Sequence, residues 1–195
     1  MDAELHHGAP GKPRLVVGLF AVWCAAGHAV TFDCTKASND VERVICSQPT
    51  LSELDENLAE AYSMLPPTPS LHASQRAWIG VRNACKNAEC IAATYERRIA
   101  DLACGAENEA AGSAIGASAC ATARLRVLDR ELNARERASR KALAAWRAAR
   151  SVRCREEGSA DGGAPGWQSA LALACEVRAS EARLAANRGK SELSR

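Results

Sequence analysis

Cysteine is the residue whose spacing most restricts the chemistry of this 195-residue chain. The chain has nine cysteines, and the stretch TFDCTKASNDVERVIC at 31–46 places Cys34 and Cys46 around a short polar segment. Thiols arranged in this way can form disulfides, bind a metal as thiolates or act as nucleophiles. The compartment decides between these uses, because disulfides persist only in oxidising surroundings.

The N-terminus indicates that compartment. Lys12 and Arg14 precede an apolar run at 15–26, and small residues follow up to Ala29. A basic start, a short apolar core and small residues at the cut are typical of a secretory signal peptide, so we expect residues 1–29 to be removed. A buried core helix is the alternative interpretation of this run. The run is too short to span a bilayer comfortably, and no later segment is apolar enough to do so.

Removal of this segment changes which chemistry remains. Cys24 is lost, and the bulky Trp23 before it does not suit lipid attachment, so we expect a periplasmic or secreted protein without a lipid anchor. Three of the four histidines are lost as well, which leaves only His72. No histidine pair for zinc and no evident pair of nucleophile and base remain. We therefore expect neither enzymatic activity nor a cofactor.

An even number of cysteines in an exported protein with a small core predicts a disulfide framework. Each disulfide would contribute roughly 2–4 kcal/mol, mainly by constraining the unfolded chain. A site with four thiolates around a metal is the alternative. The eight cysteines concerned are Cys34, Cys46, Cys85, Cys90, Cys104, Cys120, Cys154 and Cys175.

The cysteines belong to a unit that occurs twice along the chain, which predicts tandem domains at 30–105 and 106–195. The Gly/Ala/Ser-rich stretch 106–118 reads as a linker with little to bury. The corresponding positions are Cys34 and Cys104, Cys46 and Cys120, Asp55 and Asp129, Trp78 and Trp146, Arg82 and Arg150, Cys85 and Cys154, Cys90 and Cys175, and Arg98 and Arg183.

The elements that position these residues are helices. Aromatic residues are only 4% of the chain, and apolar residues recur at steps of three and four. In the first unit we expect a helix from Pro49, a second one capped by Ser70, and a third one opening at Cys90. The second of these helices should bury Ala73, Ala77, Trp78 and Val81 on one face.

The second unit should repeat this pattern, with two helices nearly fused over 125–155 and a Gly-rich loop at 158–166. The expected fold class is all-α, with two tandem disulfide-stapled helical-hairpin bundles after the signal peptide. In antiparallel helices the four cysteines of a unit meet at one pole, and three pairings per unit fit that arrangement. Among them we favour Cys34–Cys46 with Cys85–Cys90, and Cys104–Cys120 with Cys154–Cys175.

The first unit also carries recognisable motifs, FDC-x-K-A, IC-x-x-P-x-L-x-x-L-D-x-x-L-x-x-A-Y, Q-x-x-W-x-x-x-R-N-x-C and C-I-x-x-x-Y-x-x-R-I. Together they resemble the LprI-type lysozyme-inhibitor family of exported bacterial proteins. The resemblance runs from Phe32 to Leu102 and implies a helical, disulfide-stapled periplasmic domain and, in the founding case, inhibition of lysozyme. Its remaining positions are Cys34, Cys46, Leu54, Asp55, Tyr62, Gln75, Trp78, Arg82, Asn83, Cys85, Cys90, Tyr95 and Arg98.

The second unit departs from these motifs, since Leu143 stands where Gln75 stands and Glu136 where Tyr62 stands. In the first unit, Gln75 and two motif residues that follow it, Trp78 and Arg82, share one helix face. That face is either a recognition surface for a sugar polymer or a lysozyme, or a core tryptophan with Arg82 paired to a neighbouring acid, Asp55. We favour the structural interpretation, because a tryptophan on an apolar stripe is usually buried.

The two units differ in charge. Residues 30–105 hold 7 Lys and Arg against 10 Asp and Glu, net −3, whereas residues 106–195 hold 16 against 11, net +5. An acidic first unit suits a cationic lysozyme as the protein partner. The alternative function is an envelope-binding module that uses the basic second unit to contact peptidoglycan or an anionic partner.

The basic residues of the second unit spread around a helix, which favours a solvated face over a binding patch. No aromatic residues are interleaved with them, so we do not expect nucleic-acid binding. These basic residues are Arg135, Arg137, Arg140, Lys141, Arg147 and Arg150.

Overall fold

The protein is described here from a computed structural model, which covers residues 31–105 and 108–193. The expected signal peptide lies outside these residues. The described part of the chain is helical and contains no strand. Its elements are η1 (Cys34–Lys36), α1 (Asp40–Ser47), α2 (Pro49–Ser63), α3 (Pro69–Asn83), α4 (Ala88–Cys104), η2 (Glu109–Gly112), α5 (Ala114–Arg135), η3 (Arg137–Ser139), α6 (Arg140–Ala160) and α7 (Pro165–Leu193).

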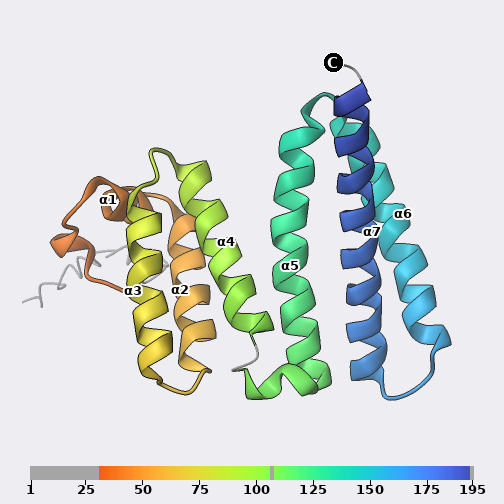
Figure 1. Cartoon of the computed structure of the whole chain (residues 1–195), viewed down its shortest axis with the longest axis horizontal. Coiled ribbons are helices and arrows are strands. Elements are labelled where there is room, and N and C mark those ends of the chain that lie inside the picture. The colour runs from red at the N-terminus through yellow and green to blue at the C-terminus, as the bar shows by residue number, and fades with distance from the viewer. Residues whose placement is uncertain (1–30, 106–107, 194–195) are drawn as a thin grey trace, which may run out of the picture.

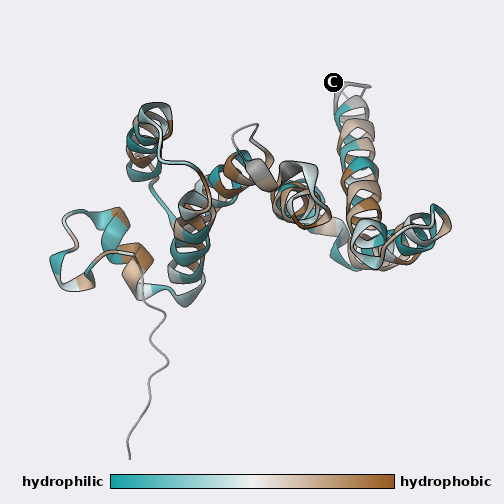
Figure 2. Cartoon of the chain, turned by 90° about the horizontal axis from the view of Figure 1, so that it is seen from below, coloured by the Kyte–Doolittle hydropathy of each residue, from teal (hydrophilic) through white to brown (hydrophobic). Residues whose placement is uncertain are grey.

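The helices form two bundles that stand side by side, as the repeat predicts (Figure 1). The first bundle contains α1 to α4 and the second contains α5 to α7, and α4 packs against α5 between them. Seen from below, the helices form an elongated row with no common centre (Figure 2). Each unit has three long antiparallel helices, so the second unit starts in the direction opposite to the first. In Figure 1, α2 and α4 run downward whereas α5 and α7 run upward.

Side chains that precede the helices cap their N-termini. The Asn39 side chain accepts a hydrogen bond from the backbone of α1, and Asn87 does the same for α4. The expected cap at Ser70 is wrong, because Thr68 caps α3 instead and accepts a hydrogen bond from the Leu71 amide at 3.1 Å. The reason is Pro69, whose fixed φ suits the first helical position and whose missing N–H costs nothing there.

The expected apolar face of α3 is also wrong. Ala73, Ala77 and Val81 are exposed, Val81 to 61%. α3 lies at the edge of the bundle and packs against α4, and it makes little direct contact with α2. Small alanines gain little from burial, so the inward face is set instead by Trp78 and Arg82, which reach partners on α4.

All eight cysteines of the described residues form disulfides, in the pairing favoured from the sequence. These are Cys34–Cys46, Cys85–Cys90, Cys104–Cys120 and Cys154–Cys175. The four-thiolate metal site is therefore excluded for these cysteines, since none within residues 31–105 and 108–193 is left as a thiolate ligand. Within the described ranges no helix is long and apolar enough to cross a membrane.

The junction between the units is more structured than a linker. Residues 109–112 form η2, and α5 begins at Ala114. Gly116, in the first turn of α5, is buried. Cys104, the last residue of α4, is bonded to Cys120 on α5, which ties the two bundles together. The two helices expected to be nearly fused over 125–155 are separate, because α5 ends before η3 and α6 turns back beside α7.

The first bundle has one continuous apolar core, centred on Ile45, Leu51, Ile91 and Tyr95, which are at most 2% exposed. The core of the second bundle is divided into two smaller clusters, one around Leu125 and one around three leucines, Leu132, Leu143 and Leu184. The second bundle therefore depends more on its disulfide and on polar contacts between helices.

Gly158 permits the close approach of α6 and α7. A Cβ at this position would lie 2.5 Å from the Gln168 carbonyl oxygen and 2.9 Å from the Ala172 nitrogen. Both atoms belong to the backbone of α7 and cannot move away alone. The turn between the two helices then needs Gly162 and Gly163, whose φ angles are +70° and +86°.

Gly158→Ala should therefore destabilise the protein by about 1–3 kcal/mol, because the added methyl group pushes α6 away from α7. The control is Gly80→Ala on α3, where a Cβ meets nothing within 4 Å and should stabilise the helix by up to about 1 kcal/mol. Urea unfolding of the oxidised chain measures both. Equal effects at the two positions would show that α6 and α7 do not approach closely at Gly158.

Candidate functional site

An arginine is buried at the centre of the first bundle. The Arg82 side chain comes from α3 and is only 6% exposed. Its guanidinium lies 5.7 Å from the ring centroid of Trp78, one turn earlier on the same helix. Burial of such a cation is costly unless charges and acceptors surround it. The residues that supply them define the site.

Tyr95 on α4 connects this arginine to an acid on α2. Arg82 Nη1 donates to the Tyr95 hydroxyl at 3.2 Å, and that hydroxyl donates to Asp55 Oδ1 at 2.7 Å. Burial, followed by the hydrogen bond to Asp55, raises the pKa of Tyr95 well above its ordinary value of 10.0. The phenol therefore keeps its proton, and its hydroxyl bridges the two charged groups by accepting from Arg82 and donating to Asp55. The direct pair of Arg82 with Asp55 expected from the sequence is corrected accordingly, because the Tyr95 hydroxyl occupies the space between them.

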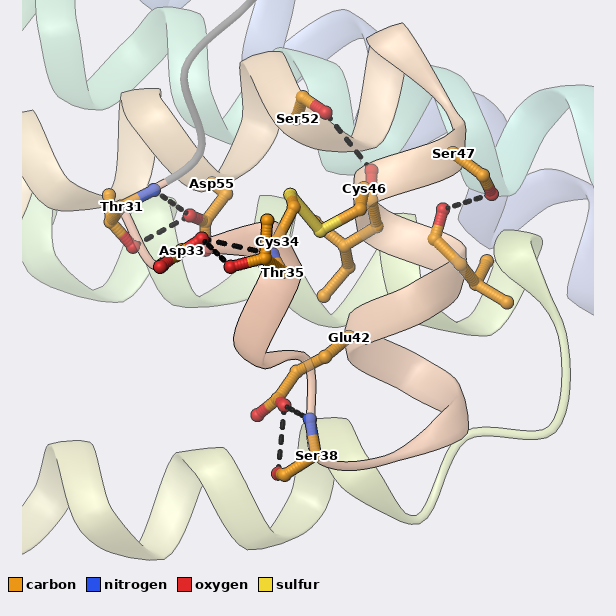
Figure 3. The surroundings of a disulfide bond; sticks show 12 residues. Thr31, Asp33, Cys34, Thr35, Ser38, Glu42, Cys46, Ser47, Ser52 and Asp55 are labelled. Carbon is orange, nitrogen blue, oxygen red and sulfur yellow. Dashed lines mark hydrogen bonds between the residues drawn. A yellow bond between two sulfur atoms is a disulfide. The ribbon is translucent and has the colours of Figure 1, made fainter.

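The segment before α1 completes the coordination of Asp55. The Thr31 amide and hydroxyl both donate to Asp55 Oδ2 at 2.7 Å, as Figure 3 shows. The same figure shows the Cys34–Cys46 disulfide, which holds this segment against α1. Ser52 on α2 donates to the Ile45 carbonyl at 3.0 Å and so fixes the angle between α1 and α2.

Glu42 on α1 supplies the second negative charge near Arg82, with Oε1 3.5 Å from Arg82 Nη2. Its other oxygen accepts the Ser38 amide at 2.6 Å and the Ser38 hydroxyl at 2.9 Å (Figure 3). The pKa of Glu42 is lowered below its ordinary value, mainly by the hydrogen bond from the Ser38 amide. Further hydrogen bonds and the positive charge of Arg82 lower it as well. The Glu42 carboxylate therefore favours its ionised form, and it faces the buried cation together with Asp55, which is linked to that cation through Tyr95.

These residues form the floor of a groove between α2 and α3 with a volume of about 440 Å³. The groove exists because α2 and α3 pack against α4 and hardly against each other. Tyr62, hydrogen-bonded to His72 at 2.8 Å, and Ile79, 38% exposed, lie along its walls. The remaining lining residues are Thr31, Phe32, Glu42, Asp55, Leu58, Ala59, Gln75, Trp78 and Arg82.

Hydrogen bonds between motif residues and their neighbours fix the side chains around the groove. Arg98 on α4 donates to the Gln75 side chain at 3.1 Å and to Ser74 at 2.9 Å. Asn83 accepts two hydrogen bonds from Arg82 while itself remaining exposed. Trp78 is only half-buried, and its indole donates to the Thr94 carbonyl at 3.3 Å.

The second bundle buries an arginine at the corresponding place. Arg150 on α6 is 5% exposed and lies over Trp146 at 5.2 Å. Here the arginine reaches the α5 acid directly, with Nη1 3.1 Å from Asp129 Oδ1. It also donates to Ser180 at 2.7 Å and pairs with Glu176 at 2.9 Å, both on α7.

Trp146 carries a second cation. The guanidinium of Arg183 lies 4.5 Å from its ring centroid and forms two hydrogen bonds, at 2.7 and 2.5 Å, with Glu136. These hydrogen bonds, with a further one from Asn187, lower the pKa of Glu136 below its ordinary value of 4.5. Neither Glu136 nor Leu143 reproduces the polar groove wall that Tyr62 and Gln75 form in the first bundle.

The sequence placed Asp55, Trp78 and Arg82 together but missed two residues that connect the charges, Tyr95 and Ser180. Tyr95 is a position of the family motif without an expected polar role, and its ring is fully buried. The signal that could have found the pair is their register, because each lies five residues after the fourth cysteine of its unit, Cys90 or Cys175. A hydroxyl at this buried position in both units indicates a polar partner inside each core.

The side chains of this site that most often take part in catalysis already have partners. Every described cysteine is in a disulfide, and His72 is bonded to Tyr62. Asp55 and Glu42 neutralise an arginine. No group of three or more His, Cys, Asp or Glu that could hold a metal occurs among residues 31–105 and 108–193.

The fold and the site define the first bundle as a small all-α domain, closed by disulfides around a buried arginine. Residues 34–102 match the family described as lysozyme inhibitor LprI. Lipoprotein LprI of Mycobacterium tuberculosis (strain ATCC 25618 / H37Rv) is 30% identical over an alignment of 80 residues, which covers 37% of this chain and 41% of that protein. Lipoprotein LprI of Mycobacterium bovis (strain ATCC BAA-935 / AF2122/97) has the same identity and coverage.

The match thus spans less than half of these relatives, and no solved structure matches the chain. The resemblance to LprI-type lysozyme inhibitors, seen in the motifs, is confirmed for the first bundle. The second bundle lies beyond the matched residues, and its relation to the first rests on the order of its cysteines and on its equivalent buried arginine.

Tyr95→Phe should destabilise the protein by about 1–3 kcal/mol, because it leaves buried polar atoms of Arg82 and Asp55 without their shared partner. The matched variant is Ser180→Ala, which removes the equivalent hydroxyl from the second bundle. Its cost should be smaller, about 1 kcal/mol, since Arg150 keeps both of its acids. Chemical unfolding measures both variants, and an equal or larger loss for Ser180→Ala would contradict the bridging role of Tyr95.

Glu136 should make stability depend on pH in the acid range. A carboxyl whose pKa is lowered in the folded state stabilises the fold above its unfolded-state pKa, and this contribution disappears as the pH falls through the folded-state value. Glu136→Gln should therefore lower the thermal midpoint at pH 7, and the difference from the unchanged chain should shrink between about pH 5 and pH 3. Glu156→Gln, at an exposed position of α6, should leave the midpoint unchanged. A difference for Glu136→Gln that stays constant with pH would contradict this account.

Proposed function

We propose that this protein is an exported, non-enzymatic inhibitor that binds lysozyme through the groove between α2 and α3. The observation that carries the proposal is the convergence of the family motif on this groove. Six motif residues that are distant in the sequence line it, namely Phe32, Asp55, Tyr62, Gln75, Trp78 and Arg82. Residues needed only for an apolar core would not have to gather at an open surface.

The chemistry of the groove suits a protein partner. Its walls combine aromatic side chains, which contribute large contact areas, with hydrogen-bonding groups such as Gln75. The charge network beneath it is rigid, because Asp55 and Arg82 are held from several elements. A preorganised surface loses little entropy on binding. The net charge of −3 over residues 30–105 supports association with a cationic lysozyme.

An oxidising compartment supports the same function. Four disulfides in a chain of this size are typical of proteins outside the cytoplasm, where lysozyme acts. We propose a periplasmic or secreted location for this reason. Binding to peptidoglycan by the second bundle stays a prediction from its charge.

The oxidised full chain should inhibit lysis of a peptidoglycan suspension by a c-type lysozyme, with a stoichiometric end point. Ile79→Lys should raise the concentration for half-inhibition roughly tenfold or more, since it places a cation at the groove wall against a cationic partner. The matched control is Val81→Lys, two residues further along α3, at a side chain that does not line the groove.

Val81→Lys should change half-inhibition by less than about twofold, because a single exposed charge outside the contact has a small effect. Equal losses for the two variants would reject the groove as the contact surface. Absence of inhibition by the unchanged chain at micromolar concentration would reject lysozyme inhibition itself.

A further inference from the structure

A second groove, lined by charged side chains, lies between the two bundles. It has a volume of about 750 Å³ and runs between α4 and the C-terminal half of α5. Figure 1 shows α4 and α5 close together at their lower ends, near the Cys104–Cys120 disulfide, and diverging upward. The groove occupies the upper, divergent end, because it is lined by Glu89 near the start of α4 and Arg137 beyond the end of α5.

The carboxylates of this groove already have partners. Glu96 receives two hydrogen bonds from Arg130, at 2.6 and 2.5 Å. Asp129 is engaged by arginines of the second bundle. Glu89 lies 3.6 Å from Arg137, with both side chains more than 60% exposed, so this pair is weak and open to competition.

Two arginines of the groove remain without an ion pair among the described residues. Arg126 on α5 and Arg140 at the start of α6 are both exposed. The helical rise of 1.5 Å per residue places Arg126 about 6 Å from Arg130 along α5, and Arg137 and Arg140 line the same groove from the segment after that helix. The four arginines form a track in the sense that they offer several separate cations along one groove.

We propose that this track, Arg126, Arg130, Arg137 and Arg140, binds a linear polyanion that carries phosphate or carboxylate groups. Guanidinium groups bind both kinds of oxyanion with paired hydrogen bonds. No aromatic side chain lines the groove, so it offers no surface on which nucleic-acid bases could stack. The site shares no lining residue with the groove between α2 and α3, so this proposal is independent of lysozyme inhibition.

Fluorescence anisotropy of the labelled, oxidised full chain tests the proposal with inorganic polyphosphate, poly-L-glutamate and neutral dextran. Binding of at least one polyanion that weakens with salt, and none of dextran, is expected. Arg126→Ala with Arg140→Ala should weaken binding at low salt roughly fivefold or more, because it removes the two arginines of the groove that have no ion pair among the described residues. The matched control is Arg153→Ala with Arg155→Ala, which removes two exposed charges from α6 outside the groove.

A single substitution of the opposite sign gives a second readout. Glu89→Gln should tighten binding roughly two- to threefold, since it releases Arg137 for the ligand. Glu181→Gln, which releases Arg124 from a comparable exposed pair elsewhere, should have less effect. Equal losses for the two double variants would overturn the proposal, as would absence of binding to both polyanions at low salt. Binding of polyphosphate alone would identify phosphate as the recognised group, and binding of both polymers would extend recognition to carboxylates.

Discussion

Each bundle is organised by the need to neutralise a buried guanidinium. Arg82 and Arg150 are about 95% buried, and a cation at such a position is tolerated only if acids and acceptors converge on it. The partners come from every long helix of the unit, so the network fixes how the helices are arranged as well as the charge. Removing one acid would leave an unbalanced buried charge at a cost of about 3–5 kcal/mol. The apolar cores alone, which in the second bundle are two small clusters, would specify the packing less well.

The two bundles meet this need by different means. In the first, the long Tyr95 side chain reaches from α4 and leaves Asp55 to receive the N-terminal segment as well. In the second, Ser180 is too short to bridge, so Asp129 contacts Arg150 directly. Glu176 adds the second charge from a position where the first unit has Ile91, one residue after the cysteine. The groove depends on the first solution and is not repeated in the second bundle.

Much of this fold could be predicted from the sequence, because cysteine order, helical periodicity and the repeat are local or countable signals. Helix ends that meet at one pole predicted that the four cysteines of a unit lie together but left three pairings open, and the favoured pairing is the one that the structure has. What failed depended on tertiary packing. The outward position of Val81 reflects which side of α3 faces a neighbour, and periodicity cannot tell this when small alanines share the stripe. The bridge through Tyr95 was hidden because a tyrosine on an apolar stripe reads as core.

The groove was beyond prediction for a further reason, since it arises from two helices that fail to pack against each other. Residues from α1, α2 and α3 meet there only because α4 holds these helices in place. The motif of the first unit identified several residues of the groove, but it did not predict that they meet at one surface.

The disulfide between Cys104 and Cys120 gives the junction an unusual covalent topology. It closes a covalent ring from Cys104 to Cys120, which includes η2 and the start of α5. The two bundles are therefore connected by two covalent paths, one through the backbone and one through the disulfide. A protease that cuts one peptide bond within this ring would leave a molecule of unchanged mass apart from one added water. The two fragments would separate only if the Cys104–Cys120 disulfide were also reduced. The chain can thus be nicked at its junction and still hold both bundles on one particle.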